Sequence, residues 1–150
     1  MVKLKFTAWP EMTLWPYLML KGWLPYRDIA IAHTPLLFID LIIVYGLFGV
    51  GLWQIKIYTW LLILLTDCLL FWIVKKLWKE KVALFSLAFY IPLQLFYEGN
   101  GLWFDLALAP IALFVFYLLK KKNYFWAGFS WASAFLTKQT AFWFLVPIGL

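Results

Sequence analysis

One long apolar run limits the folds open to this chain more than any other feature. From Ile57 to Val74 the run is interrupted only by Thr59, Thr66 and Asp67. It approaches the length of about 20 residues that crosses a bilayer as a helix. With 66% hydrophobic and 13% charged residues, the whole chain has too little polar surface to coat a soluble globule. The run therefore predicts a membrane-spanning helix.

Further apolar runs follow along the chain. They extend from Val82 to Tyr97, from about Leu102 to Leu119, and from near Phe125 through Lys138 to Pro147. A backbone in lipid must satisfy its own hydrogen bonds, which favours helices. We therefore expect an all-α, polytopic integral membrane protein with about four transmembrane helices.

Lysine clusters predict the orientation of these helices. One cluster spans Lys75 to Lys81 and the other is Lys120-Lys121-Lys122, so they flank a single helical hairpin and lie on one face. The positive-inside bias makes that face cytoplasmic, which places Glu98 to Phe104 outside the cell membrane. The net charge of +6 resides in these short loops. A nucleic-acid partner is therefore not expected.

The residues before the first confident span are harder to place. Glu11 to Leu20 is too short to cross and reads as a helix lying at the interface, among membrane lipids. Pro35 to Leu52 is apolar but contains Asp40 and three glycines, so it either crosses or lies in the interface. Asp40 favours the interface, because lipid would hardly keep an unpaired carboxylate. We expect one membrane domain, with 1–56 as an external loop carrying juxtamembrane helices and 57–150 as transmembrane helices.

A polar motif stands out in this apolar chain. Gly22-Trp23-Leu24-Pro25-Tyr26-Arg27-Asp28 is followed by His33-Thr34-Pro35, which brings a cation, a carboxylate and an imidazole together. The motif either carries chemistry or simply forms an interfacial loop in which Arg27 and Asp28 are a solvated pair.

These motifs resemble a known group of enzymes. The first loop matches on Gly22-x-x-Pro25-Tyr26-Arg27-Asp28, His33-x-Pro35-Leu36 and Leu47-Phe48-Gly49, and later segments on Trp103-Phe104-Asp105 and on Gly128 to Lys138-Gln139-Thr140. Together they resemble bacterial GT-C glycosyltransferases, the group that contains dolichyl-phosphate-mannose protein mannosyltransferases and lipid A aminoarabinose transferases.

The resemblance implies a reaction and a set of site residues. Such enzymes pass a sugar, with inversion, from a polyprenyl-phosphate donor to a lipid, glycan or protein acceptor on the extracytoplasmic face, and they need no cofactor or metal. A carboxylate must deprotonate the acceptor and cations must stabilise the leaving phosphate. The expected catalytic residues are Glu11, Asp28 and Asp105, and the expected substrate-binding residues are Arg27, His33, Lys138 and Gln139. The main catalytic carboxylate of the group is an Asp early in this loop. The nearest match here is Glu11, a departure from the group that leaves either Glu11 or Asp28 as the base.

Lys138 has two interpretations. At 1.5 Å per residue from Phe125, it lies about 20 Å along its helix, in the outer half of the bilayer. It either contacts the phosphate of the donor or pairs with Asp67 or Asp105 inside the bundle.

Two further expectations follow from the apolar pattern and the resemblance. A non-enzymatic transporter fragment would show the same hydropathy, with Asp67 and Lys138 as ion-path residues. A transferase would gather Glu11, Asp28 and Asp105 at one external rim instead.

Members of the group also have more helices and a leading span, so we expect these 150 residues to be the N-terminal part of a longer enzyme and inactive alone.

Overall fold

The computed structural model describes residue 6 and residues 9–97 and 101–144. In these residues the regular structure is helical and contains no strand, as the sequence predicts. The helices are α1 (Pro10–Leu20), α2 (Leu36–Phe48), α3 (Leu52–Leu77), α4 (Glu80–Tyr97), α5 (Phe104–Lys120), α6 (Tyr124–Thr137) and the 3-10 helix η1 (Gln139–Phe144).

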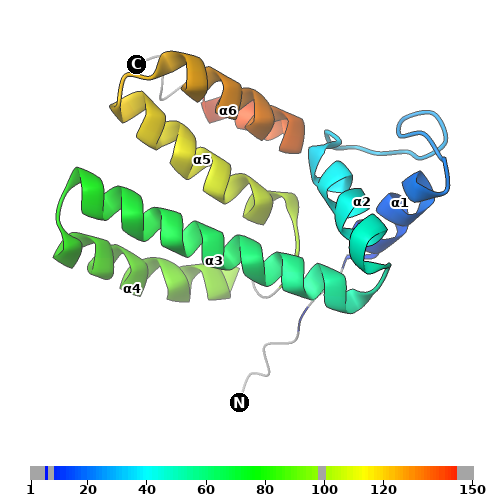
Figure 1. The fold of residues 1–150 in the computed structure, drawn as a ribbon, viewed down its shortest axis with the longest axis horizontal. Helices are drawn as coiled ribbons and strands as arrows, with labels where there is room; N and C mark the ends of the chain where they lie inside the picture. The colour runs from blue at the N-terminus through cyan, green and yellow to red at the C-terminus, as the bar shows by residue number, and fades with distance from the viewer. Residues whose placement is uncertain (1–5, 7–8, 98–100, 145–150) are drawn as a thin grey trace.

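Two helical hairpins and a pair of short helices make up the fold. Helix α3 pairs with α4, α5 pairs with α6, and α5 packs on α3 to join the hairpins. Helices α1 and α2 pack on each other beside the N-terminal end of α3 (Figure 1).

Helix α3 has the properties of a transmembrane helix. Its 26 residues span about 39 Å, and only 17% of its most apolar window is buried in the protein. A core helix of a soluble protein would bury most of that window, whereas most of this window faces outward from the protein. The predicted span is confirmed as a helix, and it extends beyond both predicted ends to Leu52 and Leu77. The predicted division at residue 56 therefore falls inside α3.

Helices α4 and α5 begin and end within about two residues of their predicted runs. They are shorter, at 18 and 17 residues. Among the described residues, α3 is the one helix that length and composition alone mark as able to cross a membrane. The number of four spans thus stays a prediction. Large apolar side chains cover the outside of α4 and α6 as well, for example Phe85 (69% exposed) and Phe125 (76% exposed).

Helix α2 starts and ends at the same end of the bundle. Just before it, the Thr34 hydroxyl donates to the carbonyl of Phe135 near the end of α6, at 2.9 Å. At its other end, the Gln54 amide in the first turn of α3 donates to the carbonyl of Phe48, at 2.8 Å. Its 13 residues span only about 20 Å. The placement of this segment in the interface stays a prediction.

A buried core fixes α1 and α2 against the start of α5. Met12, Phe38 and Phe104 are fully buried, and the rings of Phe38 and Phe104 meet edge to face at 5.3 Å. The Tyr45 hydroxyl donates to the carbonyl of Met12 at 3.0 Å, which ties α2 to α1. The polar loop between these helices is thereby held near the start of α5.

The predicted fourth span is wrong in one respect. Instead of running through Lys138, helix α6 ends at Thr137, and Lys138 is extended, with φ −151° and ψ 126°. Helix η1 then folds back, because the Trp131 indole donates to the carbonyl of Ala141 at 3.1 Å and Ala141 is fully buried. Hydropathy could not show this break, since both sides of it are apolar. Residues 145–150 and the predicted turn at 98–100 lie outside the described residues.

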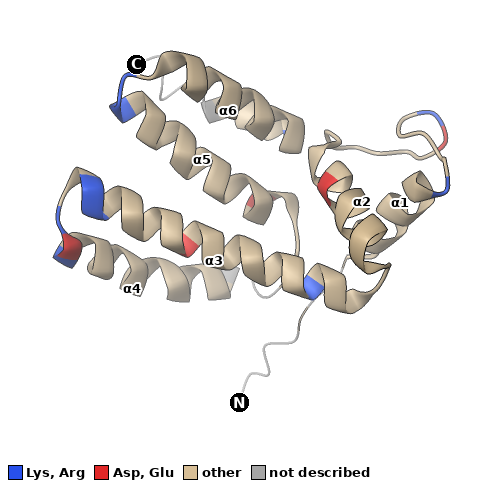
Figure 2. Cartoon of the chain, in the orientation of Figure 1, with Lys and Arg blue, Asp and Glu red and all other residues tan. Residues whose placement is uncertain are grey.

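Positive charge gathers at one end of the bundle. Figure 2 shows the lysines of the α3–α4 and α5–α6 turns together at the end opposite α1 and α2. The turns lie together because the hairpins pack side by side through α3 and α5. The two lysine clusters thus share a face, as their spacing predicts.

This arrangement makes a testable prediction about orientation. In a Cys68→Ser background, Lys121→Cys should resist an impermeant thiol reagent in intact cells, and Arg27→Cys should react. Lys79→Cys is the matched control on the lysine-rich end and should behave like Lys121→Cys. Labelling of Lys121→Cys without Arg27→Cys would reverse the orientation.

Candidate functional site

Three segments that are distant in the sequence meet at the end of the bundle opposite the lysine clusters. They are residues 32–34, the start of α5, and the break between α6 and η1. The Gln139 amide donates to the carbonyl of Ala32 at 2.8 Å, and Thr34 bonds to Phe135 as described above. These bonds hold the extended segment before α2 across the end of α6.

An ion pair lies at this junction. The ammonium of Lys138 donates to both carboxylate oxygens of Asp105, at 2.6 and 2.7 Å. The Lys138 side chain is only 15% exposed, whereas that of Asp105 is 42% exposed. A nearly buried ammonium is costly unless it is paired, so the carboxylate stabilises it. Asp105 also lies in the first turn of α5, where the helix dipole favours a negative charge.

The imidazole of His33 is held by aromatic rings. Its centroid lies 4.2 Å from the Phe104 ring and 6.0 Å from the Trp103 ring. Its Nδ1 is buried and has no hydrogen-bond partner among the described residues. The Tyr26 hydroxyl donates to the backbone carbonyl of His33 at 2.8 Å. The ring is thus held by its aromatic neighbours, and one of its buried nitrogens has no partner among the described residues.

Glu11 lies in the first turn of α1, and that turn lies beside the start of α5. The rings of Trp9 and Trp103 are 5.0 Å apart and link the two helix starts. The Oε2 atom of Glu11 is buried and lacks a partner among the described residues. An uncommitted carboxylate of this kind is available to accept a proton.

Arg27 and Asp28 are committed to each other. The guanidinium lies 2.8 Å from Asp28 Oδ2, and the same oxygen accepts the backbone N–H of Leu24 at 2.8 Å. The side chain of Arg27 is 71% exposed. The Arg27 hydrogen bond, followed by that of Leu24, lowers the pKa of Asp28. Asp28 is therefore a weaker base than an ordinary aspartate.

The structure sorts the predicted site residues into groups. His33, Asp105, Lys138 and Gln139 lie at one junction. Glu11 adjoins it through the Trp9–Trp103 contact, whereas Arg27 and Asp28 occupy an exposed turn connected to it through Tyr26. Of the two carboxylates considered as partners of Lys138, Asp105 is the one that pairs with it.

Sequence reasoning missed the aromatic contribution to the site. Trp103 and Phe104 were noted only as part of a motif, yet they hold His33 and meet Trp9. Their position directly before Asp105 was the available signal. Thr34 and Tyr26 were missed because hydrogen bonds to a distant backbone leave no local pattern.

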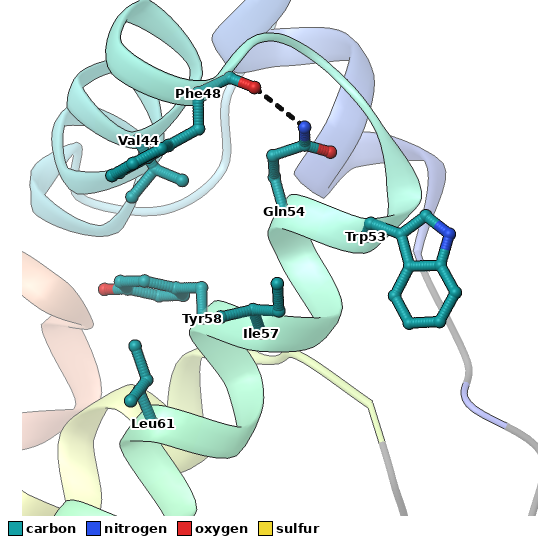
Figure 3. Close-up of a pocket in the computed structure, with 7 residues that line it drawn as sticks. All are labelled: Val44, Phe48, Trp53, Gln54, Ile57, Tyr58 and Leu61. Carbon is teal, nitrogen blue, oxygen red and sulfur yellow. Dashed lines mark hydrogen bonds between the residues drawn. The ribbon is translucent and has the colours of Figure 1, made fainter.

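An apolar pocket of about 430 Å³ lies between α2 and α3 (Figure 3). Val44 and Phe48 of α2 face Ile57 and Leu61 of α3. The side-chain amide of Gln54 donates a hydrogen bond to the Phe48 carbonyl. Across the described residues, no three histidine, cysteine or carboxylate side chains gather as a metal site would require.

Comparison with known proteins identifies the family. Residues 32–150 match the family model of dolichyl-phosphate-mannose-protein mannosyltransferase. The chain belongs to this family. Its members are membrane glycosyltransferases that use lipid-linked sugar donors, so the resemblance seen in the motifs is confirmed at that level. Comparisons with curated proteins and with solved structures give no match.

The family match covers the junction but not the whole candidate site. His33, Asp105, Lys138 and Gln139 lie within residues 32–150. Glu11, Arg27 and Asp28 precede the matched region, so their roles rest on the structure and on their chemistry alone.

The Asp28 turn makes a testable prediction about pH. Because the folded-state pKa of Asp28 lies below the ordinary value of 3.8, the turn is stabilised above that pH and loses this stabilisation as pH falls through the lower folded-state pKa. The Leu24 amide should be protected from hydrogen exchange near neutral pH and lose protection in acid. Asp28→Ala should remove the protection at every pH, and an unchanged Leu24 amide in that variant would contradict the assignment.

Proposed function

We propose that this protein transfers a sugar from a polyprenyl-phosphate donor to an acceptor hydroxyl on the extracytoplasmic face of the cell membrane, with inversion. The acceptor is a lipid, a glycan or a protein. The Asp105–Lys138 pair carries this proposal. The pair places a nearly buried cation, Lys138, at the end of the bundle opposite the lysine-rich turns. Both residues lie inside the region that matches the glycosyltransferase family.

Each polar group at the junction, and Glu11 beside it, has a role in this reaction. Glu11 is the base, since its buried oxygen is uncommitted among the described residues. Lys138 keeps its pair with Asp105, whose two oxygens orient the ammonium, and turns the remaining N–H to the donor phosphate. His33 presents Nδ1 to the phosphate or the sugar. Gln139 fixes the backbone at Ala32 and so acts by positioning.

The chemical step follows from these roles. Glu11 takes the proton of the acceptor hydroxyl, and the oxygen attacks the anomeric carbon from the face opposite the phosphate. The new carbon–oxygen bond forms as the bond between the anomeric carbon and the phosphate oxygen breaks. Polyprenyl phosphate leaves with the electron pair, and Lys138 stabilises the charge that develops on it. Attack from the opposite face inverts the configuration.

Asp28 is the weaker candidate for the base. Its carboxylate accepts hydrogen bonds from Arg27 and Leu24, and these lower its pKa. A general base works best when its pKa lies near the working pH. Arg27 is exposed and keeps part of its guanidinium available, so a role for it in binding an incoming anionic substrate is compatible with its place in the turn.

A transporter would use its charges differently. Asp67 lies midway along α3, and its buried Oδ1 has no partner among the described residues, which is the one observation that favours an ion path. Lys138, however, pairs with Asp105 at the end of the bundle rather than with Asp67. This pairing at the end of the bundle supports the transferase proposal over the transporter.

The first test of this function concerns Glu11. In the protein as the cell expresses it, purified into nanodiscs, Glu11→Gln should lower kcat by about a hundredfold to ten-thousandfold, because the base is lost. Glu80→Gln is the matched control, since Glu80 pairs with Lys75 in the lysine-rich end. Full activity of Glu11→Gln, together with loss of activity in Asp28→Asn, would move the role of base to Asp28.

The second test concerns Lys138. Lys138→Met should weaken binding of the prenyl-phosphate donor by about tenfold to a hundredfold while the protein stays folded, because a charged hydrogen bond to phosphate is lost. Lys75→Met removes the matched ion pair at the other end and should leave donor binding unchanged. A purely structural pair would instead lower thermal stability, and Asp105→Asn would partly restore it. Unchanged donor affinity in folded Lys138→Met would exclude the phosphate role.

A further inference from the structure

The last turns of α3 and α5 share one sequence pattern. The α3 segment is Phe71-Trp72-Ile73-Val74-Lys75-Lys76, and the α5 segment is Phe116-Tyr117-Leu118-Leu119-Lys120-Lys121. In both, two aromatic residues precede two lysines by four positions. Residues four apart lie on the same face of a helix, so each lysine can reach back over a ring. The two helix ends therefore carry the same arrangement of rings and cations.

The structure places every one of these lysines over its ring. In α3 the ammonium nitrogens lie 5.5 Å from the Phe71 centroid and 4.9 Å from the Trp72 centroid. In α5 they lie 5.7 Å from the Phe116 centroid and 5.9 Å from the Tyr117 centroid. Distances of up to about 6 Å allow a cation to be attracted by the face of a ring. The rings therefore restrict where these long side chains lie.

The second rings of the two segments contact each other. The centroids of Trp72 and Tyr117 are 4.8 Å apart, which is part of the packing of α3 on α5. Lys76 lies over Trp72 and Lys121 lies over Tyr117. The contact between the rings therefore brings two ammonium groups, from different hairpins, to the same place on the surface. We call these four residues the paired lysine site.

The positive charge of this site is not balanced within the described part of the chain. Glu80 is the one acidic residue in the two lysine-rich turns, 75–81 and 120–123, and it pairs with Lys75 at 2.9 Å. Lys76 and Lys121 are exposed and form no ion pair with any described carboxylate. Two neighbouring cations repel each other, so an anion between them would stabilise the site.

The surroundings of the site favour a lipid as the source of that anion. Trp72 is 43% exposed on the outer surface of α3, the helix whose length and composition suit a membrane span. Tryptophan and tyrosine are enriched at the level of the lipid head groups, and the lysines follow them at the helix ends. The ammonium groups of Lys76 and Lys121 would then lie at the level of the phosphates of the bilayer (Figure 2).

We propose that the paired lysine site binds the head group of an anionic phospholipid of the surrounding leaflet, with its phosphate between Lys76 and Lys121. The lipid connects α3, which belongs to one helical hairpin, to α5, which belongs to the other. It thus stabilises the packing of the two hairpins at the end opposite the candidate active site. This proposal does not depend on the reaction that the protein catalyses.

A second lysine over aromatic rings shows why two cations matter. Lys56, near the start of α3, lies 4.8 Å from the ring centroids of both Trp53 and Trp60. It is a single cation already attracted by two rings, and its segment has no counterpart on α5. A phosphate there would meet one ammonium instead of two. Lys56 is therefore a useful comparison for the paired lysine site.

The first experiment removes the two cations and uses a matched control at the same end. Native mass spectrometry measures lipid binding to the protein as the cell expresses it, in detergent micelles. The lipids are dioleoylphosphatidylglycerol, which is anionic, and dioleoylphosphatidylcholine, which has no net charge. The double variant Lys76→Gln, Lys121→Gln is compared with Lys79→Gln, Lys81→Gln, which removes the same number of charges from the same end.

The expected result separates a defined site from general attraction by positive charge. The Lys76→Gln, Lys121→Gln variant should weaken the tightest binding of phosphatidylglycerol by about tenfold to a hundredfold. The control pair and Lys56→Gln should each change it by less than about threefold, and phosphatidylcholine binding should stay the same in all variants. An equal loss in the control pair, or unchanged binding in Lys76→Gln, Lys121→Gln, would overturn the proposal. Binding of glycerol 3-phosphate as tight as that of the lipid would also overturn it, since the site would then be one for a soluble anion.

A second experiment keeps every charge and changes the rings. Tyr117→Leu removes the ring that contacts Trp72, whereas Phe116→Leu removes the neighbouring ring, which lies under Lys120. Tyr117→Leu should weaken phosphatidylglycerol binding by about threefold to tenfold and reduce the rise in thermal stability that this lipid gives. Phe116→Leu should have little effect on either. Equal effects of the two variants, or unchanged lipid binding in Tyr117→Leu, would overturn the placement of the site at the contact between α3 and α5.

Discussion

The ion pair between Asp105 and Lys138 is the interaction on which the site depends. It joins the first turn of α5 to the point where α6 ends, with contacts of 2.6 and 2.7 Å. Removing one partner of a fully buried pair costs about 3–5 kcal/mol, and the partial exposure of Asp105 reduces that cost here. Because Lys138 lies just beyond α6, the pair also fixes where η1 turns back and where Gln139 can reach Ala32.

Contacts between aromatic rings hold the other side of the site together. Trp103 contacts Trp9, and Phe104 contacts both His33 and Phe38. Since apolar helices gain little from burial within lipid, shape-complementary contacts of this kind must supply the specificity of packing. The result is that two short helices and a polar loop are held against the start of α5, beside the ion pair.

Some polar groups of the site already have a hydrogen-bond or ion-pair partner within the protein, and others do not. Asp28 and Arg27 satisfy each other, and Gln139 serves the backbone at Ala32. Glu11 and His33 each retain a buried atom that lacks a partner among the described residues. Buried polar atoms are normally paired, so those that are not deserve a functional explanation. A substrate with a hydroxyl and a phosphate would pair with both.

The helices of this protein were largely determined by its sequence, because each long apolar run must close its backbone hydrogen bonds locally. The runs predicted α3, α4 and α5, and the lysine spacing predicted that both clusters share one end. The sequence also indicated Asp105 and Lys138 as candidate site residues. It did not decide whether Lys138 contacts Asp67, Asp105 or the donor phosphate. Only the tertiary structure showed that α6 stops at Thr137, that Lys138 pairs with Asp105, and that Trp103 and Phe104 hold His33. These features depend on contacts between residues far apart in the chain. A hydropathy pattern cannot predict them, because it does not indicate which distant residue a side chain contacts.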